Sequence, residues 1–251
     1  MISNAFALSP LALAGCALIV LVAGLARGFA GFGLSAIVVG GLSLFIAPAE
    51  AVVLAILSEV LASLGQARGI WADIRWRMLA LLLGGAALGI PVGVYLLTVL
   101  DAEATRIAIA VFMALSSLAL LAGARFALKM TDARTGVLGL VSGVVNGLTA
   151  MGGMPVALAF SASRMPAATL RATMIAYFFV LDTYAASLMA TQGLIGGHSL
   201  VRLATLLPFL GLGIFLGTRG FHIASAETFR RLTLALMIAL SVMVLGKAFL
   251  A

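Results

Sequence analysis

Charged residues are scarce in this chain. Only 9% of its 251 residues are charged, whereas 64% are apolar and the mean hydropathy is +1.25. Soluble domains are about 25% charged, and a soluble fold needs a polar surface to cover its apolar interior. The composition therefore excludes a sizeable soluble catalytic domain, a nucleic-acid-binding module and a disordered tail. It indicates an integral membrane protein.

Cysteine, histidine and lysine are nearly absent, and each shortage excludes a kind of chemistry. The one cysteine, Cys16, lies in an apolar run, so the chain has no disulfide framework. His198 and His222 have no acidic or cysteine partners at metal-ligand spacing, and we expect neither a metal nor a cofactor. No phosphate-binding loop with its lysine and no Gly-x-Ser-x-Gly elbow occurs in the sequence. ATP-driven transport by this chain alone is excluded, and we do not expect an enzyme.

The net charge of +7 does not indicate a nucleic-acid partner, because the 15 basic residues are scattered through short loops. Basic membrane proteins follow from the positive-inside rule. The first ten residues contain no Lys or Arg and so lack the charged region of a cleavable signal peptide. We expect the N-terminus to be retained.

Long apolar runs are the main structural signal. A helix needs about 20 apolar residues to cross a bilayer, and no alternation with a period of two indicates barrel strands. We therefore predict an all-α polytopic membrane protein with about 8–10 membrane helices. The predicted apolar segments are 8–46, 49–67, 78–100, 105–122, 136–160, 167–190, 200–216 and 229–250.

The same markers occur twice in the same order. A glycine-rich stretch, then a proline, then a Gly-x-x-x-Gly pair, then Glu-x-x-Arg occur in each half at a nearly constant offset. This pattern predicts a first repeat at 1–124, a cytoplasmic basic linker at 125–135 and a second repeat at 136–251. The marker pairs are 24–33 and 143–152, Pro48 and Pro166, 89–93 and 213–217, and 103–106 and 227–230.

The basic loops of the two halves predict opposite orientations. Arg68, Arg75 and Arg77 mark one cytoplasmic loop, whereas the loop at 193–199, at the equivalent level of the second half, is nearly uncharged. Inverted repeats require each half to cross the membrane an odd number of times. The stretch 8–46 must then return to its starting side, either as two shortened helices or as a re-entrant hairpin. We expect both termini outside the cytoplasm.

Two glycine-rich stretches, which we call the first seam (residues 24–33) and the second seam (residues 143–153), interrupt apolar runs at equivalent places. Paired interruptions of this kind indicate a transporter binding site. The start of a short helix, an arginine and an amide together suit a small oxyanion. The alternative is that the glycines only let helices pack closely, which we favour for Gly89, Gly93, Gly213 and Gly217. The predicted substrate-binding residues are Arg27, Gly31, Gly33, Ser35, Asn146, Thr149, Gly152, Gly153, Arg171 and Tyr177.

Several of these assignments have structural alternatives. Arg171 either reaches back to the second seam or marks the cytoplasmic edge, and Ser35, Thr149 and Tyr177 are of types that often pack between helices. Glu59 and Asp182 lie within predicted spans, where acids are functional candidates by default. Each is a proton-coupling candidate or a fixed partner for an arginine such as Arg27 or Arg171. For Asp182, close to Tyr184, we favour the structural role.

The twin seams, the proline after each and the two similar halves resemble the sulfite exporter TauE/SafE family of membrane permeases across essentially the whole chain. The fit departs at the seams, which read Gly31-Phe32-Gly33-Leu34 and Met151-Gly152-Gly153-Met154 where the family has a fuller glycine run. The resemblance implies a multi-pass permease of the bacterial cytoplasmic (inner) membrane.

The resemblance also implies that the permease moves sulfite, organosulfonates or related organic anions. The alternatives are a non-transporting membrane assembly partner and a passive anion channel. We expect a small anionic substrate and the lipid bilayer as partners, with no nucleic acid. The apolar helix surfaces leave room for a homodimer.

Overall fold

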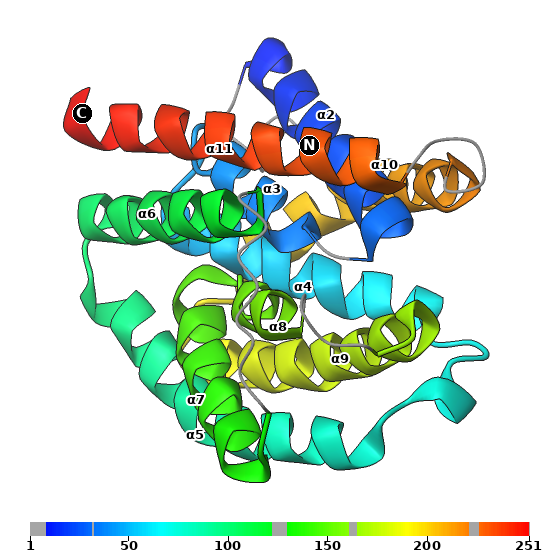
Figure 1. The fold of residues 1–251 in the computed structure, drawn as a ribbon. Helices are drawn as coiled ribbons and strands as arrows, with labels where there is room; N and C mark the ends of the chain where they lie inside the picture. The colour runs from blue at the N-terminus through cyan, green and yellow to red at the C-terminus, as the bar shows by residue number, and fades with distance from the viewer. Residues whose placement is uncertain (1–8, 32, 122–129, 161–164, 221–225, 251) are drawn as a thin grey trace.

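The computed structural model describes residues 9–31, 33–121, 130–160, 165–220 and 226–250 (Figure 1). These residues form α-helices joined by short turns, with one 3₁₀ turn at Trp71–Asp73 and no strand among them. The prediction of an all-α protein is therefore confirmed. The helices are α2 (Pro10–Ala30), α3 (Leu34–Leu42), α4 (Pro48–Gln66), α5 (Trp76–Val99), α6 (Ala102–Leu121), α7 (Asp132–Thr149), α8 (Gly153–Phe160), α9 (Ala167–Thr191), α10 (Gly197–Gly220) and α11 (Ala226–Leu250).

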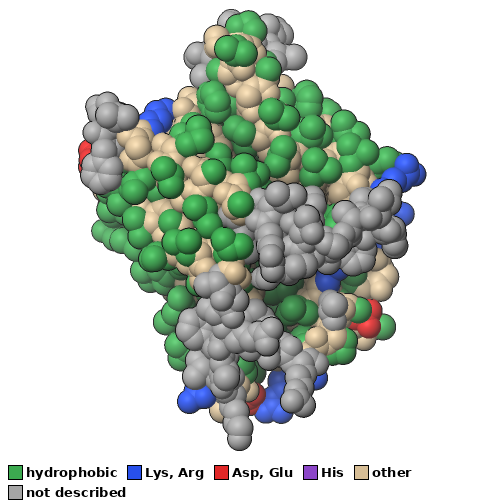
Figure 2. Space-filling view, turned by 45° about the horizontal axis from the view of Figure 1, so that its top comes forward, with side chains coloured by type: hydrophobic (Ala, Val, Ile, Leu, Met, Phe, Trp, Pro, Cys, Tyr) green, Lys and Arg blue, Asp and Glu red, His purple; other side chains and the backbone are tan. Residues whose placement is uncertain are grey.

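Six of the described helices, α2, α4, α5, α6, α9 and α10, are long and apolar enough to cross a membrane. Their outer faces carry large apolar side chains such as Leu88, Tyr95 and Leu115, each more than half exposed. Figure 2 shows such side chains over most of one face, with charged groups near its margins. An apolar surface of this size is unfavourable in contact with water. The helices therefore face lipid, and the prediction of a multi-pass membrane protein is confirmed.

The described residues form ten α-helices, which agrees with the predicted 8–10 including broken ones, and six of them meet the length and composition of a full span. In α11 the apolar helical stretch is Ala235–Ala248. Helices α3 and α8 have 9 and 8 residues, which at about 1.5 Å per residue is too short to span a bilayer. The sequence correctly predicts that both apolar runs containing the seams are broken into a longer helix and a short one.

Glycines bring helices of the two halves into backbone contact. A Cβ at Gly89 of α5 would lie 2.2 Å from the Leu140 carbonyl oxygen of α7, and one at Gly213 of α10 would lie 2.3 Å from the Leu21 carbonyl oxygen of α2. The packing role predicted for these Gly-x-x-x-Gly pairs is confirmed. Figure 1 also shows α6 beside α11, and α4 packs against α9. This reciprocal pairing is consistent with two repeats, whose limits and inverted orientation stay predictions.

The backbone at the two seams follows one pattern. Helix α2 ends at Gly31 (φ 77°), whose N–H donates to the Arg27 carbonyl at 2.9 Å. Helix α7 ends at Ala150 (φ 58°), whose N–H donates to the Asn146 carbonyl at 2.8 Å. Both residues have left-handed backbone, a conformation that costs a residue with a Cβ about 1–2 kcal/mol. Glycine relieves this cost in the first seam, whereas alanine bears it in the second.

Exchanging these two residue types tests the equivalence of the seams. We expect Ala150→Gly to raise the free energy of unfolding by about 1 kcal/mol, because it removes the left-handed strain. Gly31→Ala should lower it by about the same amount, since a Cβ there meets only the Arg171 side chain, at 3.7 Å. Thermal unfolding of both detergent-solubilised variants measures the two shifts. Shifts of the same sign would contradict the equivalence.

Candidate functional site

The centre of the bundle holds a fully buried arginine. Arg27, in the last turn of α2, has no exposed surface. Its Nη1 donates to the Gly31 carbonyl at 2.7 Å, and its Nη2 donates to Ser63 Oγ at 2.9 Å. The same Nη2 lies 3.4 Å from Glu59 Oε2. Arg27 thus joins the first seam to α4, while its Nε has no hydrogen-bond partner.

Glu59 connects Arg27 to the start of the short helix α3. Its Oε1 accepts a hydrogen bond from Ser35 Oγ at 2.8 Å, and its side chain is 2% exposed. Ser35 lies in the first turn of α3, where backbone N–H groups have no partner within the helix. Glu59 therefore fits the predicted role of fixed arginine partner, and this geometry leaves its role in proton coupling a prediction.

The second seam is built around an amide instead of an arginine. Asn146 Nδ2 donates to Asp182 Oδ1 at 2.7 Å, and Asn146 Oδ1 accepts from the Gly152 N–H at 3.1 Å. Tyr177 donates through its hydroxyl to Ser142 Oγ at 2.7 Å, and Ser142 Oγ donates to the Gly152 carbonyl. These bonds hold the break between α7 and α8 to α9. Asn146 and Tyr177 are thus engaged with protein groups.

Phe178 of α9 lies between the two seams. Its ring centroid is 4.8 Å from the Arg27 guanidinium carbon, a cation–π contact. A Cβ at Gly153 would lie 2.2 Å from the same ring, so glycine is needed there for the ring to pack on the start of α8. The aromatic side chain therefore separates Arg27 from the second seam.

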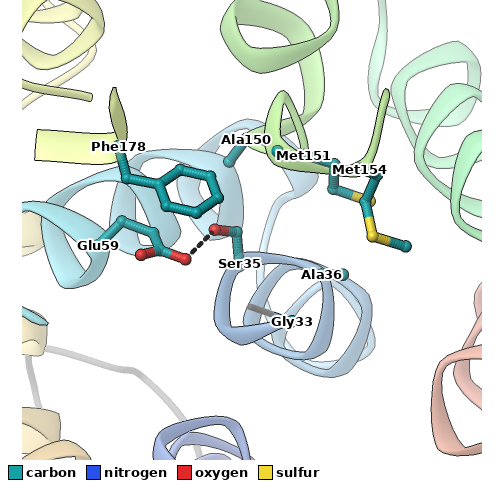
Figure 3. A pocket seen from close by; sticks show the side chains of 9 residues that line it. Gly33, Ser35, Ala36, Glu59, Ala150, Met151, Met154 and Phe178 are labelled. Atoms are coloured by element: carbon teal, nitrogen blue, oxygen red, sulfur yellow. Dashed lines mark hydrogen bonds between the residues drawn. The ribbon is translucent and has the colours of Figure 1, made fainter. Parts of the chain in front are cut away.

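A small cavity lies where the seams meet (Figure 3). Ser35, Glu59 and Phe178 lie on one side of it, and Met151 and Met154 lie on the other. The centre of a water molecule could occupy about 20 Å³ of this cavity. That volume is about enough for one water molecule. A sulfite or sulfonate group needs more room. The cavity in this conformation is therefore too small for such a group.

The other predicted residues have different surroundings. Thr149 Oγ1 donates to the Val145 carbonyl at 2.8 Å and accepts from the Met151 N–H at 3.3 Å, which caps the break. Arg171 is exposed, and its side chain lies beside Gly31 of the first seam instead of the second. Asp182 is buried and bonded to Asn146. The structure thus brings Arg27, Ser35, Glu59, Asn146 and Asp182 together and places Arg171 at the margin.

Sequence reasoning missed three residues of this centre: Ser63, Ser142 and Phe178. Helical spacing gives a signal for each of them, because residues four apart share a helix face. Ser63 follows Glu59 by four positions, and Phe178 precedes Asp182 by four. For Ser142, four residues before Asn146, the same rule applies, but serines of this kind are common between membrane helices.

The fold by itself defines a class of protein. It is a multi-pass membrane protein whose helices enclose a polar centre at two broken helices. The family model described as sulfite exporter TauE/SafE matches residues 16–244, and the chain belongs to that family. Membership makes it a membrane permease of the transporter type, as the resemblance predicts. No curated protein and no solved structure gave a match.

The Arg27–Glu59 pair offers a test of the charge arrangement. Glu59→Gln removes one partner of a buried ion pair and should lower the free energy of unfolding by about 3–5 kcal/mol. The double variant Arg27→Gln/Glu59→Gln leaves no unpaired charge in the pair and should regain most of that loss. Thermal or denaturant unfolding in detergent gives both values.

A surface ion pair serves as the matched control. Arg77 pairs with Asp132 where both side chains are largely exposed, so Asp132→Asn should change stability by less than about 1 kcal/mol. Equal losses of stability from Glu59→Gln and Asp132→Asn would contradict this account. They would mean that water, and not Glu59, stabilises the charge of Arg27.

Proposed function

We propose that this protein is a secondary transporter that moves a small sulfur-containing or organic anion, such as sulfite or an organosulfonate, across the membrane by alternating access coupled to protons. The observation that carries the proposal is the buried Arg27 guanidinium at the first seam, with a free Nε and the start of α3 beside it. Guanidinium and backbone N–H donors together suit an oxyanion.

The first seam has more unused donors than the second. At the second seam the N–H groups of Gly152 and Met154 already donate to Asn146 Oδ1 and the Met151 carbonyl. Helix α3 begins at Leu34, and its N-cap residue Gly33 supplies no side-chain cap, so its first N–H groups remain available to a ligand. We therefore place the anion between Arg27 and the start of α3, with Phe178 closing the site toward Gly153.

Alternating access fits the packing of the bundle. The cavity is too small for the anion in this conformation, and the helices around it come from both halves. Backbone contacts through glycine let α2 and α10, or α5 and α7, move as pairs. Rocking of one repeat against the other would open the seams to each side in turn.

Counterflow across proteoliposomes tests transport directly. Vesicles loaded with unlabelled sulfite should take up radiolabelled sulfite from outside, because a carrier exchanges substrate without a net gradient. Arg27→Ala should weaken apparent affinity at least tenfold, the loss expected when a charged hydrogen-bond donor worth about 1.5–3 kcal/mol is removed. Arg77→Ala, which alters an exposed arginine, should exchange like the wild type.

Two results would contradict the proposal. Net anion flux without counterflow would indicate a passive channel. No exchange of sulfite, sulfoacetate or taurine by well-folded protein would favour a membrane assembly partner that does not transport.

A further inference from the structure

The described residues include three buried side chains that can carry a full charge: Arg27, Glu59 and Asp182. They come from α2, α4 and α9, and Phe178, four residues before Asp182 on α9, packs its ring on the Arg27 guanidinium. The buried interior thus holds one guanidinium and two carboxyl groups. With both carboxyls ionised the cluster has a net charge of −1, which is costly at a buried position within a membrane.

An ion pair, and not the number of hydrogen bonds, gives the two carboxyl groups different roles. Glu59 Oε1 accepts from Ser35, and Glu59 Oε2, which accepts no hydrogen bond, lies 3.4 Å from Arg27 Nη2, so Glu59 is the charge partner of the guanidinium. Asp182 accepts one bond from Asn146 on Oδ1, and its buried Oδ2 has no hydrogen-bond partner. A buried carboxylate oxygen without a donor is unfavourable, whereas the neutral acid removes the charge.

We propose that Asp182 carries the coupling proton, one proton per anion, and holds it in the closed conformation described here. This assignment rests on the proposed transport function and deepens it. Asp182 accepts a hydrogen bond from Asn146 of α7, and the other ionisable groups buried in this interior are Arg27 of α2, Glu59 of α4 and, on the same helix as Asp182, Tyr177. It reverses the structural role that sequence reasoning favours for Asp182.

The charge count explains why anion and proton travel together. Ionised Asp182 leaves the centre negative and repels an incoming anion, whereas protonated Asp182 leaves Arg27 and Glu59 balanced. The anion binds with the proton in place. When the centre opens on the other side, the Asp182 O–H bond breaks, the proton passes to water, and the restored negative charge expels the anion. The complete cycle moves no net charge.

Infrared spectroscopy of the purified protein tests whether Asp182 holds a proton. The wild type at neutral pH should show the carbonyl stretch of a protonated carboxylic acid, shifted in heavy water. Asp182→Asn should lose this band, and Glu103→Gln, at an exposed position, should keep it. A wild type without the band, or a band that persists in Asp182→Asn, would overturn the proposal.

Uptake of methanesulfonate by proteoliposomes tests coupling, because this anion keeps its charge across the pH range used. The wild type should accumulate it in the direction of the proton gradient, about tenfold per pH unit for one proton per anion. Asp182→Asn should show no pH-driven accumulation, and Glu103→Gln should match the wild type.

The outcomes separate the two proposals. Accumulation by Asp182→Asn equal to that of the wild type, or accumulation that follows a sodium gradient instead, would overturn the role of Asp182. If the wild type exchanges no anion at all, the proposed transport function is wrong. The infrared band then shows by itself whether Asp182 is protonated.

Discussion

The structure depends on keeping one guanidinium inside a membrane protein. Arg27 is fully buried, and a charge at that depth persists only with a partner and hydrogen bonds. Glu59 and Ser63, both on α4, supply them together with the carbonyl of Gly31. These contacts fix how α2 ends, where α3 begins and how α4 lies across the centre. The first seam, the cavity and the position of Phe178 all follow from this arrangement.

The second seam solves the same backbone problem with neutral groups. A helix that breaks inside a membrane leaves N–H and C=O groups that must find partners within the protein. At the first seam Arg27 donates a hydrogen bond to the Gly31 carbonyl. At the second seam Ser142 donates to the Gly152 carbonyl, and Asn146 accepts from the Gly152 N–H. The two halves are therefore alike in backbone and different in charge. The proposed anion site lies at the charged first seam, and the proposed proton carrier lies at the second.

Much of the fold is predictable from the sequence because long apolar runs and glycine interruptions are local signals. The helix limits agree closely with the predicted segments, and both broken helices lie at the seams. Arg27 and Asn146 are correctly placed at the two breaks. The sequence also predicts the packing role of the glycine pairs in α5 and α10, since close helix contact requires small residues at regular spacing.

The details that decide function are contacts between distant segments, and a single sequence does not contain them. Helical spacing places Ser63 on the same face as Glu59, but nothing local shows that Ser63 or Phe178 contacts Arg27. The contact of Arg171 with the first seam depends on how α9 lies against α2, which the sequence does not determine. The unpartnered oxygen of Asp182 appears only once Asn146 is seen to reach a single oxygen of that carboxylate.

The central claim is that Arg27 and the start of α3 bind an anion. Thermal unfolding of the purified protein against sulfite, sulfate, thiosulfate, sulfoacetate, taurine, acetate and phosphate, at constant chloride, tests it most directly. A cognate anion at 100 times its Kd should stabilise the wild type by about 2.7 kcal/mol, and Arg27→Ala should lose that shift. No stabilisation by any of these anions, or an equal shift in Arg27→Ala, would contradict the claim.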